Sequence, residues 1–163
     1  MNKRTVYLET TIVSYYVARP SRDLIIAARQ QLTHEWWDEH RQKYRLVVSP
    51  VVAREIAAGD PAVAERRMEL LAGVSVLSTE TPINSLAREI ESALRIPKPK
   101  VADALHLAYA IHHKVDIFLT WNCTHLANPD MERPLYDYCI ANRLWFPLIC
   151  TPEEMIARKE IPE

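Results

Sequence analysis

The chain has 163 residues, which is enough for one domain with a sizeable core, and we treat residues 1–163 as a single domain. Its formal net charge of −1 excludes a generally basic surface, so any contact with nucleic acid must come from local patches, and only two glycines leave no room for a glycine-rich phosphate loop. The three cysteines form no C-x-x-C pair, which predicts reduced thiols and a cytoplasmic location. The chain has neither a signal-peptide start nor an apolar run of bilayer length, which predicts no membrane contact.

The first half of the chain begins with a strand rich in β-branched and aromatic residues, Arg4–Leu8. A short apolar helix, Ile12–Val17, follows, and then a long amphipathic helix over Asp23–Tyr44. Within that helix we expect Trp36 and Trp37 to be core or interface residues and not a platform for nucleotide stacking. The further elements predicted here are a strand Arg45–Ser49, a helix opened by Ser49 and Pro50, a charged helix Pro61–Leu71, a strand Val74–Leu77 and a helix from Thr81 to Leu94.

The centre of the chain combines a buried helix with a buried strand. The helix, Val101–Ile111, is apolar except at Asp103 and His106, and the strand Val115–Thr120 follows it closely. After a polar loop, the remaining elements are a helix Leu135–Arg143, a strand Pro147–Cys150 and a final helix Met155–Lys159. Five strands that alternate with helices predict a parallel sheet in a three-layer α/β domain.

Three carboxylates and one amide fall at element ends that such a sheet brings together. Glu9 follows the first strand, Glu55 borders the apolar face of the helix after the second, Asp103 opens the central helix, and Asn122 follows the fourth strand. Clustered oxygen ligands suit Mg²⁺ or Mn²⁺, which lower the pKa of a bound water and stabilise phosphoryl transition states. Each residue also has a simpler interpretation: Glu9 and Asp103 can complement helix dipoles, and Asn122 can shape a turn.

Four segments, YLETT, SPVVAREI, ADALHLAYAI and DIFLTWNCTHL, resemble in this order the signature segments of PIN-domain proteins. The similarity is greatest to the VapC-type ribonuclease toxins of type II toxin–antitoxin systems. The resemblance implies a five-stranded parallel sheet flanked by helices, an acidic pocket for Mg²⁺ or Mn²⁺, and endonucleolytic cleavage of RNA. It also implies a homodimer and inhibition by a small antitoxin protein.

The resemblance assigns the four acidic positions of the family to Glu9, Glu55, Asp103 and Asn122, with the first three as metal ligands. Two positions depart from the family pattern, because the first and the fourth are usually Asp. Thr10 and Thr120 lie beside the site in sequence and are candidates for orienting substrate or water. Arg54 and Lys100 are candidate phosphate contacts, whereas for Lys98 we favour ordinary solvation at the surface.

Two alternatives to a metal-dependent endoribonuclease stay open. The departures at Glu9 and Asn122 are compatible with a non-catalytic PIN-like module, with an impaired metal site, that binds RNA or a protein. A zinc site is the other alternative, and its ligands would be His106, His113, Cys123 and His125, which lack regular ligand spacing. For the homodimer, the expected surface consists of the short first helix with Leu32, Trp36 and Trp37.

Overall fold

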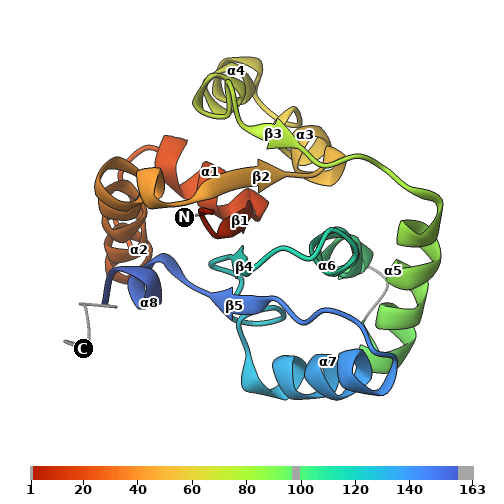
Figure 1. The fold of residues 1–163 in the computed structure, drawn as a ribbon. Coiled ribbons are helices and arrows are strands. Elements are labelled where there is room, and N and C mark those ends of the chain that lie inside the picture. The colour runs from red at the N-terminus through yellow and green to blue at the C-terminus, as the bar shows by residue number, and fades with distance from the viewer. Residues whose placement is uncertain (1, 97–99, 158–163) are drawn as a thin grey trace.

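The computed structural model describes residues 2–96 and 100–157, and it confirms the predicted α/β fold with a five-stranded parallel sheet flanked by helices (Figure 1). The strands are β1 (Thr5–Leu8), β2 (Arg45–Val48), β3 (Ser75–Val76), β4 (Ile117–Leu119) and β5 (Leu148–Cys150). The α-helices are α1 (Thr10–Val17), α2 (Leu24–Glu35), α3 (Pro50–Ile56), α4 (Pro61–Leu70), α5 (Thr81–Leu94), α6 (Val101–His112), α7 (Pro129–Ala141) and α8 (Pro152–Ala157). None of the helices in these described ranges combines the length and the hydropathy needed to span a bilayer.

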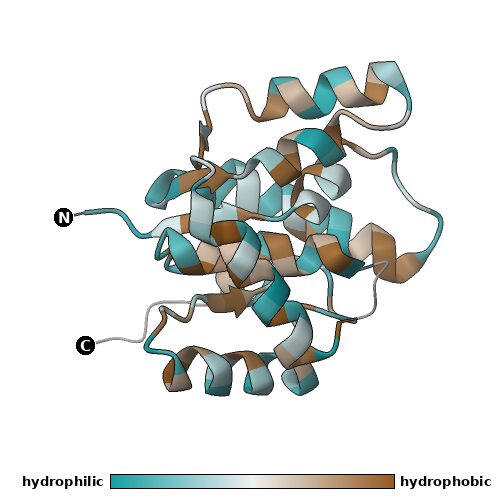
Figure 2. Ribbon diagram, turned by 90° about the vertical axis from the view of Figure 1, so that its right-hand side faces the viewer, coloured by the Kyte–Doolittle hydropathy of each residue, from teal (hydrophilic) through white to brown (hydrophobic). Residues whose placement is uncertain are grey.

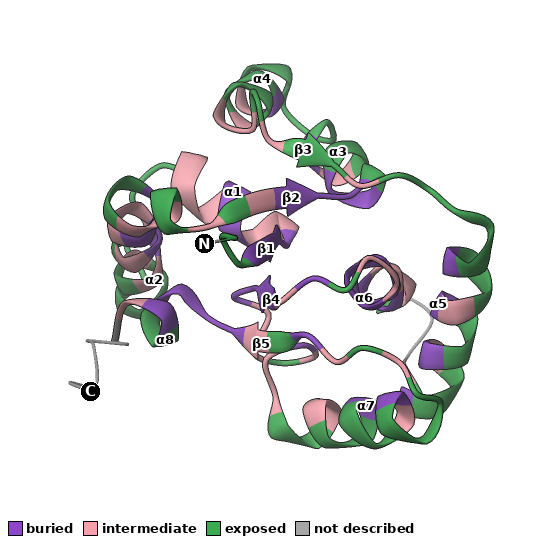
Figure 3. Cartoon of the chain, viewed as in Figure 1, coloured by how far each residue is buried: buried purple, intermediate pink, exposed green. Residues whose placement is uncertain are grey.

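The strand order, β3-β2-β1-β4-β5, places the first strand at the centre of the sheet. Tyr7 pairs with Val47 of β2 on one side and with Phe118 of β4 on the other. Strands β1 and β4 are fully buried, whereas β3 is exposed at the edge (Figure 3). Because the chain moves outward from β1 through β2 to β3 and then returns to the other side of β1, the order reverses between β1 and β4. Ligands of open α/β sheets bind at the carboxyl ends of strands that flank such a reversal.

Helices cover both sides of the sheet, with α2 and α8 on the left of Figure 1 and α5, α6 and α7 on the right. Hydrophobic segments gather in the middle of the molecule, where the strands lie (Figure 2). Helix α6 is the most deeply packed of these helices, because it lies between the sheet and α5 and all its residues from Asp103 to Ile111 except Leu105 are buried. A carboxylate and an imidazole on such a helix need polar partners, so their contacts identify the site.

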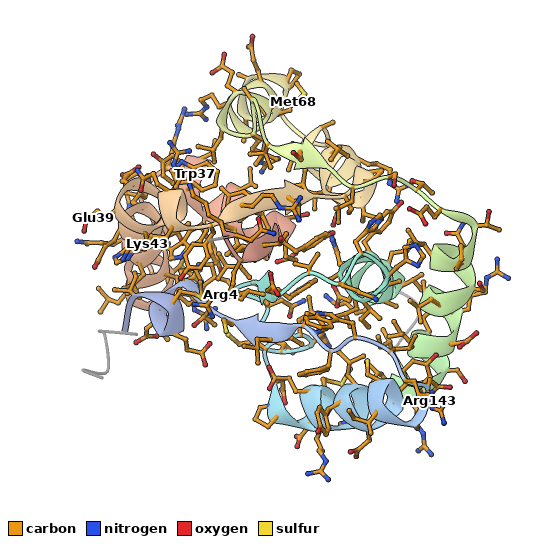
Figure 4. The ribbon with its side chains drawn as sticks, viewed as in Figure 1. Arg4, Trp37, Glu39, Lys43, Met68 and Arg143 are labelled. Carbon is orange, nitrogen blue, oxygen red and sulfur yellow. The ribbon has the colours of Figure 1, made fainter. Side chains whose placement is uncertain are left out.

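The long helix predicted over Asp23–Tyr44 is interrupted. Helix α2 ends at Glu35, and a π-helical turn over Trp36–His40 (η1) and a 3₁₀ turn over Arg41–Lys43 (η2) follow it. Adjacent positions of a regular α-helix point about 100° apart, yet here Trp36 and Trp37 are both buried, at 0% and 2% exposure. In Figure 4, Trp37 lies among packed side chains and Glu39 at the outer edge.

The prediction that the two tryptophans belong to the core is therefore confirmed. Their burial within one chain also means that Trp36 and Trp37 supply no surface for self-association, so that part of the basis for a homodimer was wrong.

Helix α7 begins at Pro129 and not at Leu135 as predicted. Asn128 caps it, because its side chain accepts a hydrogen bond from the backbone N–H of Asp130 at 2.9 Å, and Pro129 occupies the first helical position, where it is favoured. Pro134 then lies inside the helix and removes one backbone hydrogen bond, which the cap and the packing of α7 against α5 outweigh.

Candidate functional site

Glu9 lies at the carboxyl end of β1 and serves as the N-cap of α1. Its side chain is 5% exposed, and Oε2 accepts hydrogen bonds from the backbone N–H of Thr11 at 3.1 Å, from the Thr11 hydroxyl, and from the Thr120 hydroxyl at 2.8 Å. The capping interpretation is thus correct, but it is incomplete. The bond from Thr120 ties the carboxylate to the end of β4, where the sheet order reverses.

Asn122 is the corresponding residue at the end of β4. Its backbone N–H donates to the Thr120 hydroxyl at 2.9 Å, and its Oδ1 accepts from the backbone N–H of His125 at 3.0 Å, which is the expected turn-shaping role. Its Nδ2 lies 3.4 Å from Oδ2 of Asp103, across the gap to α6. Thr120 and Asn122 together therefore connect Glu9 to Asp103.

Asp103 lies in the first turn of α6 and is 8% exposed. Burial raises the pKa of its carboxyl, and the negative charge of Glu9 raises it further, while the positive charges of His106, His125 and Lys100 lower it less. A buried acid that is repelled by a second acid is stabilised by a cation between or beside them. This is the electrostatic environment expected of a metal ligand.

Glu55 approaches from α3 and is half-buried. Its Oε1 accepts hydrogen bonds from the Thr10 hydroxyl at 3.0 Å and from Nε2 of His106 at 2.5 Å. Burial opposes the charge of Glu55, but the hydrogen bond and positive charge of His106, the bond from Thr10 and the charge of Arg54 hold the pKa of Glu55 below its usual value. Glu55 is therefore ionised. Its hydrogen bond with Thr10 ties it to the residue that directly follows Glu9 in the chain.

The structure thus connects all four predicted site residues at one edge of the sheet, although not as one tight cluster. Within the described residues, two other groups have three ligand atoms within 4.8 Å of one another, namely Glu80, His112 and His113, and Glu35, Glu39 and His40. Glu9, Glu55 and Asp103 are joined instead through Thr10, Thr120 and Asn122. Oxygen donors of this kind suit Mg²⁺ or Mn²⁺, which keep several waters and can be bound through one or two direct carboxylates, with the remaining acid acting through water.

The candidate substrate contacts lie around these residues. Thr120 is fully buried and Thr10 is partly buried. Arg54 and Lys100 are exposed. The charge of Arg54 lowers the pKa of Glu55, and the charge of Lys100 lowers the pKa of Asp103. Lys98 lies outside the described residues. Arg54 and Lys100 are thus exposed cations within electrostatic reach of Glu55 and Asp103.

His106 contacts the candidate site directly, although the sequence interpretation assigned it only to the zinc alternative. Its ring is 1% exposed, with Nε2 at 2.5 Å from Glu55 and Nδ1 at 2.6 Å from the hydroxyl of Tyr7. The four proposed zinc ligands do not form a group of close ligand atoms within the described ranges, and His113 instead lies 2.8 Å from the carbonyl of Ser78 and groups with Glu80. The sequence signal for His106 was its position one helical turn after Asp103.

Comparisons with known proteins agree with this fold. None of the curated proteins matches the chain. Among solved structures, VapBC2 from Rickettsia felis bound to a DNA fragment from its promoter is similar in fold, with a TM-score of 0.52 and 11% identity over 90% of this chain and 98% of that chain. The family model of the PIN domain matches residues 6–122, a segment that includes the centre of the sheet and every site residue from Glu9 to Asn122. The chain therefore belongs to the PIN domain family.

Proposed function

We propose that this protein is a metal-dependent endoribonuclease and the toxin of a toxin–antitoxin pair. The observation that carries the proposal is Asp103, a buried carboxylate on the mainly apolar helix α6, whose pKa is raised by burial and by Glu9. A protein keeps such a group where it binds a cation or moves a proton. Membership in the PIN domain family adds support, because PIN domains are generally nucleases.

The chain's own residues would divide the work of phosphodiester cleavage. Asp103, Glu9 and Glu55 would hold Mg²⁺ or Mn²⁺, which when bound supplies an activated water and charge stabilisation at the phosphate. Thr120 fixes the Glu9 carboxylate through its hydroxyl, and Thr10 does the same for Glu55. Arg54 and Lys100, both exposed, would contact the phosphates on either side of the scissile bond.

Cleavage of a labelled single-stranded RNA by the purified protein tests the proposal, with Mg²⁺, Mn²⁺ or EDTA present. Asp103→Asn keeps the shape of the side chain and removes its charge. We expect its rate to fall at least about 100-fold, which corresponds to the several kcal/mol that a metal contributes. Asp137→Asn is a matched control, because Asp137 is an exposed acid on α7 that pairs with Arg133 of the same helix. Full activity in Asp103→Asn, or in EDTA, would contradict the proposal.

A non-catalytic binding module is the second candidate, and Asn122 favours it. Its amide occupies the position next to Asp103, where a carboxylate would add a metal ligand. RNA binding without cleavage in any metal would establish this candidate. The antitoxin would be the protein encoded beside this chain. If the chain is an endoribonuclease, co-expression with the antitoxin should suppress RNA cleavage. If the chain is a non-catalytic binding module, RNA binding is the activity that can be measured.

A further inference from the structure

We propose that His106 and Tyr7 are positioning residues that fix Glu55 for metal binding. This inference rests on the proposed function, because it assigns Glu55 a metal to bind. Its basis is a chain of buried hydrogen bonds, which we call the buried relay: Ser49, Tyr7, His106 and Glu55. Ser49 and Tyr7 are fully buried and His106 is 1% exposed, so the relay lies within the protein until it reaches Glu55.

Glu55, at the end of the relay, sets the direction of its bond with His106. An ionised Glu55 can only accept, so Nε2 of His106 carries a proton and donates to it. The Tyr7 hydroxyl lies 2.6 Å from Nδ1 of His106 and 2.7 Å from the Ser49 hydroxyl, and these two bonds hold the His106 ring from its other side. The relay therefore keeps a donor of His106 directed at Glu55.

The relay also determines which oxygen of Glu55 is left for a metal. Both hydrogen bonds that the carboxylate accepts from described residues, those from Thr10 and His106, go to Oε1. Oε2 thus remains as the ligand atom. Metal ligands are commonly oriented by such outer partners, and loss of a partner typically lowers metal affinity or activity by about 10- to 100-fold.

Helix α6 gives the relay a second consequence. His106 follows Asp103 by one turn on the same buried face, so one rigid helix carries a predicted ligand and the group that orients another. Glu55, by contrast, lies on the short helix α3 and is half-buried, with more freedom of its own. The relay thus couples the position of Glu55 on α3 to that of Asp103 on α6.

A purely structural role for the relay would change thermal stability and leave metal affinity unaltered. Tyr7→Phe tests this most cleanly, because it removes only the hydroxyl and keeps the ring that stacks on Phe118 at 5.0 Å between centroids. Tyr109→Phe is the matched control: Tyr109 is another buried tyrosine, on α6, whose hydroxyl pairs with that of Thr79 at 2.7 Å. Mn²⁺ binding, measured by calorimetry and by electron paramagnetic resonance, is the readout for each.

We expect Tyr7→Phe to weaken Mn²⁺ binding about 10-fold and His106→Leu to weaken it by up to about 100-fold, whereas Tyr109→Phe binds like the wild type. His106→Gln, whose amide can still donate to Glu55, should recover most of the affinity lost in His106→Leu. In a Glu55→Gln background, Tyr7→Phe should have no further effect, because Tyr7 acts through Glu55.

The outcomes separate the inference from the proposed function. Suppose that the wild type binds Mn²⁺ and cleaves RNA, and that the folded variants Tyr7→Phe, His106→Gln and His106→Leu all bind Mn²⁺ as the wild type does. The positioning role of His106 and Tyr7 is then overturned, while the proposed nuclease function stands. If the wild type binds no Mn²⁺, the proposed function and the inference both fail.

Discussion

Replacing Asn122 by Asp should have opposite effects on stability with and without metal. In the wild type, Nδ2 of Asn122 faces Oδ2 of Asp103 at 3.4 Å. In Asn122→Asp, a second carboxylate oxygen takes the place of that amide, and the acceptor for the backbone N–H of His125 is retained. The fold around residue 122 is thus kept, and only the charge beside Asp103 changes.

The magnitude follows from that distance. Two unit charges 3.4 Å apart in an effective dielectric of about 20 repel by about 5 kcal/mol. Asn122 is partly exposed, so solvent screens the pair, and protonation of one acid relieves more of the repulsion. We expect a net loss of about 1–2 kcal/mol without metal, which in a domain of this size lowers Tm by about 2–8 °C. With metal, the added carboxylate should tighten binding about ten-fold, which is worth about 1.4 kcal/mol.

Thermal melts in EDTA and in a series of Mn²⁺ concentrations measure both effects on the same samples, and calorimetry gives the affinity directly. Asn2→Asp serves as the control, since Asn2 is an exposed amide that precedes β1 and lies in no helix. If Asn122→Asp melts like the wild type in EDTA and binds Mn²⁺ with an unchanged midpoint, Asn122 does not share a site with Asp103.

Three further predictions concern stability and assembly. Burial and Glu9 raise the pKa of Asp103, so its charged form destabilises the native state at pH values above that raised pKa, and this penalty disappears as the pH falls through the raised pKa. Asp103→Asn should therefore be more stable to urea than the wild type at pH 7 in EDTA, and the gain should shrink towards pH 4. Arg95 ends α5 in the left-handed region, with φ 51°. Arg95→Gly should therefore raise the free energy of unfolding by about 1 kcal/mol, seen as a Tm about 2–4 °C higher. An unchanged or lower Tm would show that the arginine side chain offsets this strain. The homodimer remains a prediction, and sedimentation at micromolar concentration should give twice the chain mass; if it forms, it must use residues other than Trp36 and Trp37, such as Leu24, which is 86% exposed.

The sequence predicted the sheet because its strands are short, apolar and separated by helices, which leaves few other arrangements. It failed at residues 36–40, since the apolar spacing of the preceding helix continues through them and nothing in that periodicity distinguishes a π-helical turn from an α-helical one. It failed at the start of α7 because the polar segment before Leu135 was taken as a loop, although Asn128 and Pro129 already form a good N-terminus.

The residues of the candidate site were named from the sequence, but the hydrogen bonds that join them were not. That Glu9, Glu55, Asp103 and Asn122 would meet at one edge followed from their positions at element ends. The bonds that join them depend on side chains far apart in sequence, such as Thr120 and Glu9, which are separated by 111 positions. His106 was noted as one of two polar residues on an apolar helix, yet its contacts are with Tyr7 and Glu55, and no pattern along α6 reveals partners on β1 and α3.

The central position of β1 has a consequence for how the protein is made. Residues emerge from the ribosome in chain order, so β1 and β2 can pair early, but the other side of β1 stays open until β4 is available. Thr120, which holds Glu9, and Asn122, which faces Asp103, both come after β4. A nascent or truncated chain that stops before Ile117 therefore contains Glu9, Glu55 and Asp103 but cannot assemble the candidate site, which is complete only once translation has passed residue 122.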